Sequence, residues 1–538
     1  MQNKKAFYVI ILAITLLLGY FLGLNMNSGG ANNYSNQASF RDYDKIREVL
    51  DYVKHRYVDT IDHKKMTQSV IKNFLKDLDP HSVYVPKDEF LSSLENMQGA
   101  FDGIGIVFSI LNDTILVVNA INGGPSEKLG LMSGDKIIMV DDSLVAGVGV
   151  TDNDVMKMLR GTRGTIVKVS IKRFGESKLI DFNITRDKIP IYSVDAHYMI
   201  NSNVGYIKIS RFSRETFNEF KKALYALKQE GMQHLVLDLM NNSGGYLGVA
   251  VQIVDEFLGG DKMIVYTEGV QQQKREYRAT EKGGFENGDL VVLVDEGAAS
   301  ASEILAGAIQ DWDRGSIVGR RTFGKGLVQE QYVFNDSSAL RLTVARYYTP
   351  LGRCIQKPYD NGRNAYYQEY YNRFLSGEVY SKDSIKLNDS IRFVTPGGKV
   401  VYGGGGIVPD YFVSIDTTGS TSLYRELRRK RLIDKFSYNY VSKHRKNLLD
   451  KYANAIDFSE SISESTVILR SFKKYLIQEK VNFKTLDWQK SKDWISGSIN
   501  AKIAQQCWGA NAFFEVFNKT NPAYVKALDI LNVSVSKN

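Results

Sequence analysis

The spacing of apolar positions changes along the chain, and each change marks the boundary of a segment. Residues 6–24 carry no charge, and as a helix about 28 Å long they would match the hydrocarbon thickness of a bilayer. Lys4 and Lys5 precede this run and the next basic residue is Arg41, which favours export of the bulk of the chain. The run is longer than a usual signal-peptide core, and no Ala-x-Ala site follows it. The pattern therefore favours a signal-anchor at residues 1–27 over a cleaved signal peptide.

A polar stretch and then a helical pattern follow. Residues 28–39 are rich in Asn, Ser and Gly and indicate a flexible linker. From residue 40 to residue 97 apolar side chains recur at helical spacing, which predicts an N-terminal helical region. Within it, Asp79-Pro-His81-Ser contains a turn signal. One histidine beside a turn is weak evidence for catalysis, so we expect His81 to be structural.

Short apolar runs separated by glycine turns replace the helical pattern from Gly99 onward. With the Gly134-Asp135 turn and a short helix near residues 154–160, their order resembles a PDZ domain, which we place at residues 98–188. Such a domain binds a peptide's terminal carboxylate with the backbone N–H groups of a Gly-x-Gly loop, and the peptide adds a strand to the sheet edge. The resemblance implies a carboxylate loop and a side-chain pocket formed by Gly103, Ile104 and Gly105, and by Ile106, Phe108, Val155 and Leu159.

Strand and helix patterns alternate from residue 189 to residue 416, which predicts an α/β core. The turn Asn241-Asn-Ser-Gly-Gly245 joins a strand to a helix but fits neither a P-loop nor a dinucleotide-binding fingerprint. Residues 357–390, rich in tyrosine and polar groups, indicate an insertion or loop. Residues 417–538 are expected to form a mostly helical C-terminal extension, whose basic cluster at residues 425–431 is read as a solvated helix face or a contact with an acidic surface.

Ser300 lies where the apolar strand at residues 290–294 passes into a helix pattern. A helix N-terminus favours negative charge, so a serine there is a candidate nucleophile, with the Ala301 N–H directed at a developing oxyanion. The same residues, Ser300-Ala-Ser-Glu303, form the S-x-x-E pattern of a capping box, and on this pattern alone helix capping is favoured. Lys325, in a glycine-lined turn 25 residues later, shifts the balance towards catalysis.

Together these motifs resemble the C-terminal processing peptidases, or tail-specific proteases, which are serine endopeptidases with a Ser–Lys dyad and an inserted PDZ domain. The resemblance implies that Ser300 is the nucleophile, Lys325 the general base and Gln329 the residue that orients the lysine. It also implies an oxyanion hole made by the backbone N–H groups of Gly245 and Ala301.

The proposed base needs a lowered pKa, and three residues, Met240, Ser243 and Ala298, depart from the family pattern. Burial by Phe323 and Leu327 could lower the pKa of the lysine, as could positive charge from Arg320 or Arg321. Met240 stands where the family usually has arginine, which leaves open how the strand before the glycine turn is braced.

Composition limits the remaining interpretations. The 538 residues are 43% hydrophobic and carry a net charge of +9, which suits several folded domains and gives no argument for nucleic-acid binding. Cys354 and Cys507 are too few for a disulfide scaffold and have no metal-ligand spacing. We expect no metal and no cofactor.

The sequence thus predicts a multidomain α/β protein with a transmembrane helix, a helical N-terminal region, a mostly β PDZ domain, an α/β protease core and a helical extension. Its expected function is that of a single-pass, membrane-anchored endopeptidase whose catalytic part lies on the periplasmic or extracytoplasmic side. It would bind free C-terminal tails of protein substrates and cleave through an acyl-enzyme; a homo-oligomer or an adaptor partner is left open. The alternative is a catalytically inactive PDZ-bearing scaffold. A Ser-His-Asp hydrolase is disfavoured, because Ser300 lacks a G-x-S-x-G setting and no histidine lies in a recognisable motif.

Overall fold

The computed structural model describes residues 36–387 and 389–533. The predicted membrane segment at residues 1–27 lies outside the described residues, as does most of the predicted linker. Helix α2 (Asn36–Arg56) begins inside that segment, so residues 36–39 are helical, whereas the sequence predicts a flexible linker there. Within the described ranges, no helix combines the length and the apolar composition that a membrane crossing requires.

The chain divides into two compact units, Met1–Phe74 and Leu75–Asn538. The first unit contains α2 and most of α3 (His63–Lys76), which are amphipathic helices. The second unit begins near the predicted turn and continues through strand β1 (Val83–Val85) and helix α4 (Lys87–Gln98).

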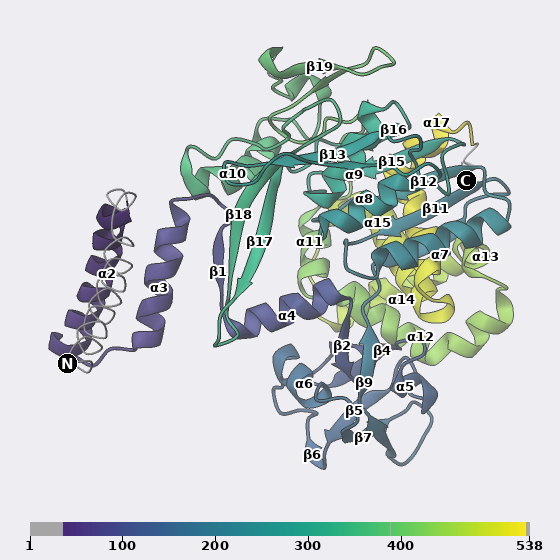
Figure 1. The fold of residues 1–538 in the computed structure, drawn as a ribbon. Coiled ribbons are helices and arrows are strands. Elements are labelled where there is room, and N and C mark those ends of the chain that lie inside the picture. Colours follow the sequence, from purple (N-terminus) through teal and green to yellow (C-terminus); the bar gives the residue numbers. More distant parts are fainter. Residues whose placement is uncertain (1–35, 388, 534–538) are drawn as a thin grey trace, which may run out of the picture. The chain divides into compact units, whose positions relative to one another are not determined.

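The PDZ segment of the second unit is an antiparallel sheet with two short helices, α5 (Pro125–Lys128) and α6 (Asp152–Leu159). The sheet order is β3-β4-β5-β7-β8, with β6 paired to β5. These strands are β3 (Ile106–Ile110), β4 (Ile115–Ala120), β5 (Lys136–Val140), β6 (Ser143–Leu144), β7 (Ile166–Lys172) and β8 (Ile180–Thr185). A separate antiparallel pair, β2 (Ala100–Gly103) with β9 (Asp187–Pro190), joins the domain to α4 and to the core (Figure 1).

The α/β core is built on a six-stranded sheet in the order β10-β11-β12-β15-β16-β21. Strand β10 is antiparallel to its neighbour and the others are parallel. The strands are β10 (Val194–Met199), β11 (Val204–Ile209), β12 (His234–Asp238), β15 (Leu290–Val294), β16 (Ser316–Gly319) and β21 (Tyr411–Phe412). The α/β core that the alternating pattern predicts is confirmed.

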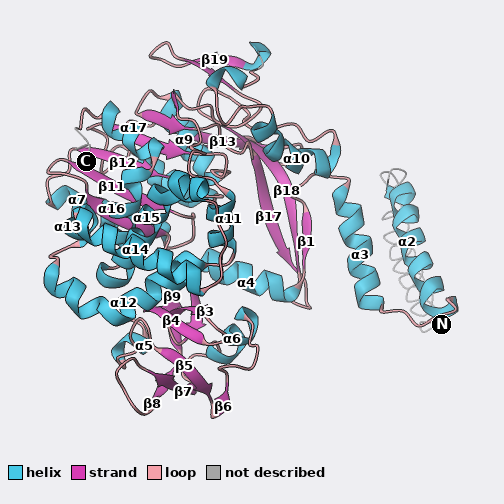
Figure 2. Ribbon diagram, turned by 180° about the vertical axis from the view of Figure 1, so that it is seen from behind, coloured by secondary structure: helices cyan, strands magenta, loops and turns pink. Residues whose placement is uncertain are grey.

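Different parts of the chain cover the two faces of this sheet. Because successive strand residues point to opposite faces, Leu235 and Leu237 pack with helices α7 (Thr216–Gln229), α8 (Leu247–Asp255) and α9 (Ala301–Asp311). Val236, between them, packs on the other face with residues of α17 (Pro522–Ile530). The C-terminal extension therefore supplies one layer of the protease core (Figure 2).

A second sheet carries the lysine region. Its central strand, β18 (Ala339–Tyr348), pairs on one side with β17 (Leu327–Val333) and on the other with β1 and β13 (Met263–Glu268). Strand β14 (Arg275–Arg278) pairs with β13, and β19 (Arg392–Val394) forms a hairpin with β20 (Val400–Tyr402). Residues 357–390, predicted as an insertion or loop, contain helix α10 (Gly362–Leu375) and two 3₁₀ turns, Lys382–Ser384 and Asp389–Ile391.

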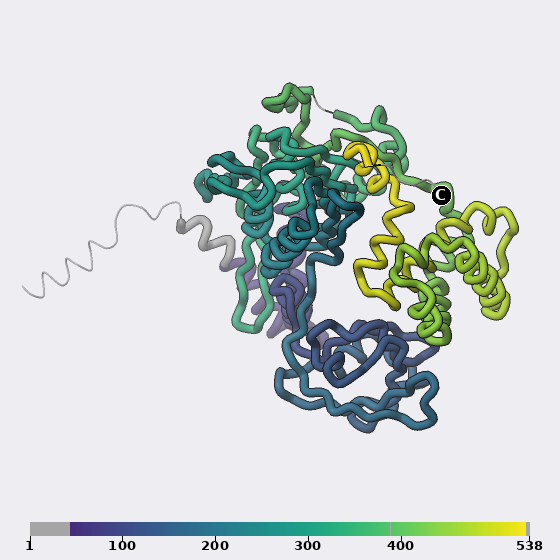
Figure 3. The backbone as a smooth tube through the Cα atoms, turned by 90° about the vertical axis from the view of Figure 1, so that its right-hand side faces the viewer, coloured from purple at the N-terminus to yellow at the C-terminus, as the bar shows by residue number. Residues whose placement is uncertain are grey.

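The extension is helical, as predicted, with a hydrophobic core of its own. Its elements are α11 (Ser422–Arg429), α12 (Leu432–Lys451), α13 (Ala455–Glu460), α14 (Ile462–Gln478), α15 (Thr485–Trp508), α16 (Ala510–Phe517), the 3₁₀ turn Asn518–Thr520 and α17. Figure 3 shows the end of this helical segment, in yellow, returning to the core.

Candidate active site

Ser300 occupies a sharp turn between β15 and α9. Its φ of 56° and ψ of −113° are strained for a residue with a side chain, and such strain is retained only where the surroundings enforce it. The glycine turn packs directly against it: a Cβ on Gly244 would lie 2.8 Å from the Ser300 Cβ and 2.9 Å from the Ala301 nitrogen. The two loops that the sequence singled out are therefore in contact, and glycine is needed where they meet.

Glu303 links the serine turn to the lysine turn. Its carboxylate accepts the Ser300 N–H at 2.8 Å, which is the glutamate half of the predicted capping box. It also accepts the Lys325 N–H at 2.9 Å, the Gly324 N–H at 2.7 Å and the Thr322 hydroxyl at 2.6 Å. Burial raises the pKa of Glu303, and these hydrogen bonds oppose that rise. The capping-box motif predicts the hydrogen bond of Glu303 to the Ser300 N–H. It does not predict the hydrogen bonds of Glu303 to the lysine turn, which only the tertiary structure shows.

Gly245 and Ala301 both adjoin the contact between the glycine turn and Ser300. Gly245, at φ 152°, lies so close to the backbone of Phe212 that a Cβ would strike the Phe212 carbonyl oxygen. The Phe212 N–H donates to the Gly244 carbonyl at 3.0 Å, and the Tyr246 N–H donates to the Phe212 carbonyl at 2.8 Å. Among residues 36–387 and 389–533, neither the Gly245 nor the Ala301 N–H donates to a protein acceptor. Two such donors beside a serine suit an anionic oxygen.

A buried lysine braces the strand that leads to the glycine turn, at the strand end that carries Met240. Lys208 Nζ donates to Asp238 Oδ1 at 2.8 Å and to the Met240 carbonyl at 2.6 Å. Asp238 also accepts the Met240 N–H at 2.8 Å and the Tyr206 hydroxyl at 2.7 Å. The Met240 side chain packs on the other side against the cluster that contains α17. The charge of Lys208 on β11 and the apolar contact of Met240 with the extension thus hold the end of β12.

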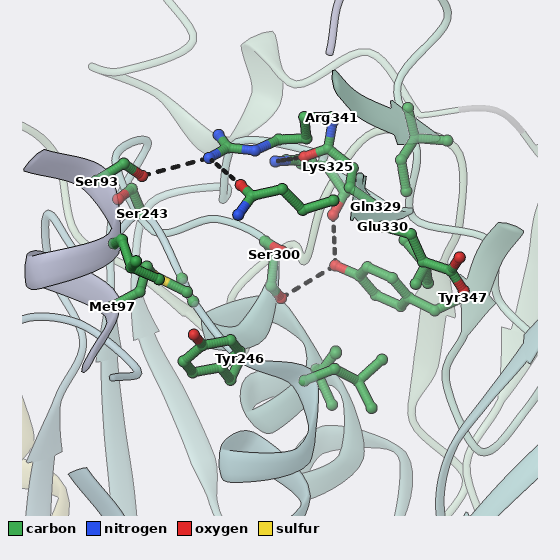
Figure 4. Close-up of a pocket in the computed structure, with 18 residues that line it drawn as sticks. Ser93, Met97, Ser243, Tyr246, Ser300, Lys325, Gln329, Glu330, Arg341 and Tyr347 are labelled. Carbon is green, nitrogen blue, oxygen red and sulfur yellow. Dashed lines mark hydrogen bonds between the residues drawn. The ribbon is translucent and has the colours of Figure 1, made fainter. Parts of the chain in front are cut away.

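Lys325 and Gln329 form the hydrogen bond that the resemblance implies. Lys325 Nζ donates to Gln329 Oε1 at 3.1 Å, and Gln329 Nε2 donates to the His81 carbonyl at 2.6 Å, which fixes the orientation of the amide. Within the described residues no hydrogen bond joins Lys325 Nζ to Ser300, and such contacts are often long until substrate binds. The side chains of Lys325 and Ser300 line the same cavity (Figure 4).

Burial, with a smaller effect of the nearby positive charge of Arg341, lowers the pKa of Lys325 to about 8, while Glu303 and Asp79 act in the opposite direction. The prediction that Arg320 or Arg321 supplies this charge is wrong. Arg320 pairs with Glu296 at 2.7 Å, and Arg321 pairs with two other glutamates, so neither charge is directed at the lysine. No sequence signal marked Arg341, which reaches the site from β18.

The cavity between these groups has a volume of about 480 Å³. Its walls come from α4, the glycine turn, the serine turn, β17 and β18. The apolar part is formed by Leu94, Met97, Tyr246, Leu247, Ile304, Leu327, Val328 and Tyr347, and the polar part by Ser93, Ser243, Ser300, Lys325, Gln329, Glu330, Gln331 and Arg341. The Tyr347 hydroxyl lies 3.0 Å from the Ser300 carbonyl and 2.5 Å from the Lys325 carbonyl, and so connects the two turns.

His81 has the structural role that was expected. Its ring Nε2 lies 2.9 Å from the Tyr366 hydroxyl, and burial, with a smaller effect of Lys325, lowers the pKa of the ring to about 3. A neutral ring bonded to Tyr366 and a carbonyl bonded to Gln329 make His81 a support of the lysine site.

The predicted PDZ residues occupy the expected elements but are mostly packed inside the domain. Gly103 ends β2, and Gly105 has the positive φ, 76°, of a tight loop. The core of the domain includes Ile104, Ile106, Val155 and Leu159, with Phe108 partly buried against it. Strand β3 is at the sheet edge, the position that peptide addition needs. Their contact with a peptide stays a prediction.

Comparisons with known proteins agree with the position of these segments. Residues 203–360 match peptidase family S41, residues 103–185 match the PDZ domain family, and residues 423–509 match a family of unknown function, DUF8443. A carboxy-terminal-processing protease of Bartonella bacilliformis is 34% identical over 353 residues, covering 64% of this chain and 80% of that protein. The carboxy-terminal processing protease CtpA of Bacillus subtilis is 32% identical over 357 residues, covering 66% and 76%. A solved photosystem II D1 C-terminal processing protease is 27% identical, with a TM-score of 0.36, and the match covers 70% of this chain and 88% of that one.

Proposed function

The chain belongs to the carboxy-terminal-processing proteases and is a serine endopeptidase, and we propose that Ser300 and Lys325 form its catalytic dyad. The observation that carries the proposal is the lowered pKa of Lys325, about 8, in the cavity that also contains Ser300. With an ordinary pKa of about 10.4 a lysine would be neutral in about one molecule per thousand at pH 7.4, whereas at about 8 it is neutral in about one in five. Burial thus makes Lys325 available as a base.

In the proposed reaction neutral Lys325 Nζ removes the proton of the Ser300 hydroxyl, and Ser300 Oγ attacks the substrate carbonyl carbon. The resulting oxyanion is stabilised by the N–H groups of Gly245 and Ala301. Lys325 then gives its proton to the departing amine, and the C–N bond breaks to leave an acyl-enzyme. Water, deprotonated by the same lysine, hydrolyses the ester and restores Ser300. Gln329 directs the lysine lone pair by accepting a hydrogen bond from Nζ.

We further propose that substrates are proteins with free C-terminal tails that the PDZ domain binds at the edge of β3. The support is the edge position of β3 beside the Gly103–Gly105 loop, together with the carboxy-terminal processing named for the relatives. Cleavage of a peptide acid but not of the matching C-terminal amide is expected. Equal cleavage of both forms would show that the terminal carboxylate is not recognised.

Residues 1–27 are proposed to anchor the enzyme, with the catalytic part on the extracytoplasmic side of the membrane. The support is the uncharged run at residues 6–24 after Lys4 and Lys5. Protease added to spheroplasts should degrade the catalytic part. If the catalytic part is protected until the cells are lysed, it lies on the cytoplasmic side and the proposed topology is wrong.

The decisive test of the dyad compares Ser300→Ala and Lys325→Arg with Ser302→Ala. Ser302 is the matched serine, because it is buried and its hydroxyl donates to the Asn242 carbonyl instead of facing the cavity. Ser300→Ala should abolish turnover and should lower the free energy of unfolding by no more than the loss of a cap, about 1 kcal/mol. Lys325→Arg should be equally inactive, since a guanidinium stays protonated.

Two results would overturn this assignment. Near-normal turnover by Lys325→Arg would mean that the lysine acts only as a charge. Peptide binding by the wild-type protein without any turnover would favour the inactive PDZ-bearing scaffold.

A further inference from the structure

Helix α10 contacts the lysine turn through a buried arginine. Arg373 is 3% exposed, and its guanidinium donates to three successive carbonyl oxygens. The distances are 3.1 Å to Arg321, 2.8 Å to Thr322 and 3.1 Å to Phe323. These carbonyls belong to the backbone that leads directly into Lys325, so one planar cation holds the path of the turn.

An ion-pair cluster keeps this guanidinium in place. Arg373 Nε donates to Glu369 Oε1 at 2.8 Å, one helical turn away on α10. Glu369 also pairs with Lys357 at 2.8 Å and with Arg321 at 3.1 Å. Although burial opposes it, Arg373 and Lys357 lower the pKa of Glu369 to about 2, so the carboxylate is charged at any working pH. The cluster fixes Arg373 to the lysine turn and to its own helix.

The same helix reaches Gln329 by a second route. The Tyr366 hydroxyl lies 2.9 Å from His81 Nε2, and the Tyr366 ring packs edge-on against Phe323, with 5.9 Å between centroids. The His81 carbonyl accepts the Gln329 amide at 2.6 Å. Tyr366 is 2% exposed and therefore has little freedom to move. Helix α10 thus supports both the lysine and the amide that is bonded to it.

We propose that α10 is the element that positions the base of this protease, with Arg373 holding the Lys325 turn and Tyr366 holding Gln329 through His81. Both are positioning residues, because neither lines the cavity that contains Ser300. The proposal rests on the Ser300–Lys325 dyad. It predicts that disturbing α10 lowers kcat and leaves KM nearly unchanged, since the cavity walls that would contact substrate come from other elements.

Arg373→Lys tests the first contact. A lysine ammonium cannot span three carbonyls as a planar guanidinium does, so the turn should loosen and kcat should fall between about 10-fold and 100-fold, as expected for a displaced catalytic group. The loosened turn should also let water reach Lys325, moving the inflection of the kcat/KM profile to higher pH.

Tyr366→Phe tests the second contact without disturbing a buried charge. It removes the hydroxyl, with its 2.9 Å contact to His81 and a longer hydrogen bond accepted from Gln356 Nε2 at 3.5 Å, and keeps the ring packing. We expect a fall in kcat of about fivefold, the effect of the shorter hydrogen bond. In a Gln329→Ala background the same substitution should have no further effect, because its route to the lysine is already lost. Tyr371→Phe, at a 61% exposed position of the same helix, is the matched control and should leave kcat and KM unchanged.

The outcomes separate this proposal from the dyad on which it rests. If Lys325→Ala retains turnover, the dyad is wrong. If Lys325→Ala is inactive while Arg373→Lys and Tyr366→Phe keep wild-type kcat and an unchanged pH profile, the dyad stands and the role of α10 is refuted. Additive effects of Tyr366→Phe and Gln329→Ala would equally refute the route through His81.

Discussion

Replacing Lys325 with methionine should abolish peptide cleavage and at the same time stabilise the fold near neutral pH. The native environment lowers the pKa of this lysine from 10.5 to about 8, mainly by burial. Holding the charged form in the folded state at pH 7 therefore costs about 3 kcal/mol. Methionine fills similar space without charge, but the substitution removes the hydrogen bond to Gln329 Oε1, worth about 1 kcal/mol. A net gain of about 2 kcal/mol at pH 7 is expected.

The pH dependence of this gain identifies its cause. Below pH 8 the lysine is protonated in both the folded and the unfolded state, so its full cost is present. Between about pH 8 and 10.5 the folded state has released the proton while the unfolded state retains it, so the stability of the wild-type protein rises with pH. The advantage of Lys325→Met should therefore shrink steadily across this interval and, because the hydrogen bond to Gln329 is still lost, reverse near its upper end.

Urea unfolding of the two proteins at pH 7, 8, 9 and 10, followed by tryptophan fluorescence, measures the effect. Lys222→Met, at an exposed position of α7, is the matched control and should change stability by less than about 0.5 kcal/mol. A destabilised Lys325→Met protein, or a gain that stays constant from pH 7 to pH 10, would refute the reasoning that burial tunes this lysine.

Three further predictions concern the groups around the dyad and the extension. Glu303→Gln places an amide N–H₂ against backbone N–H donors and should therefore lower kcat/KM. It should also lower the free energy of unfolding, measured by chemical denaturation, by about 1–3 kcal/mol. Unchanged kinetics would show that the link between the serine turn and the lysine turn is dispensable. Arg341→Met removes a positive charge that lowers the pKa of Lys325, so the kcat/KM profile of a peptide substrate should move to higher pH, and a profile that moves to lower pH would contradict this sign. Tyr524→Ala opens a cavity between α17 and the sheet and should cost about 3–5 kcal/mol, measured by thermal unfolding, whereas Ile462→Ala at a 78% exposed position should have little effect.

Several parts of the site could be predicted from the sequence because short-range chemistry specifies them. The apolar run at residues 290–294 has the length and composition of a buried strand, and all five residues are buried in β15. The glycines at 244 and 245 mark a turn where a side chain would collide with another segment, and such constraints are visible as residue type. The spacing of Lys325 and Gln329 likewise allows their hydrogen bond within one local segment.

Other parts were missed because their local pattern was misleading. The buried residues of α10 are Tyr366 and Arg373, so the inward face of this helix lacks the apolar stripe by which amphipathic helices are recognised. The sequence therefore predicts an insertion or loop in this segment. Arg373 is stable in the interior only because three carbonyls and Glu369 surround it, and none of these partners can be inferred from periodicity.

The sequence by itself determined the order of the segments, the α/β core, the serine turn and the residues proposed as nucleophile and base. Only the tertiary structure decided what tunes and holds them: Arg341 arrives from β18, His81 from a turn 248 residues before Gln329, and Lys208 from a strand next to the one that leads to the glycine turn. The physical reason is that electrostatic and hydrogen-bond effects depend on distance in space and on exclusion of water. Sequence separation sets neither quantity when the partners lie on different strands and helices.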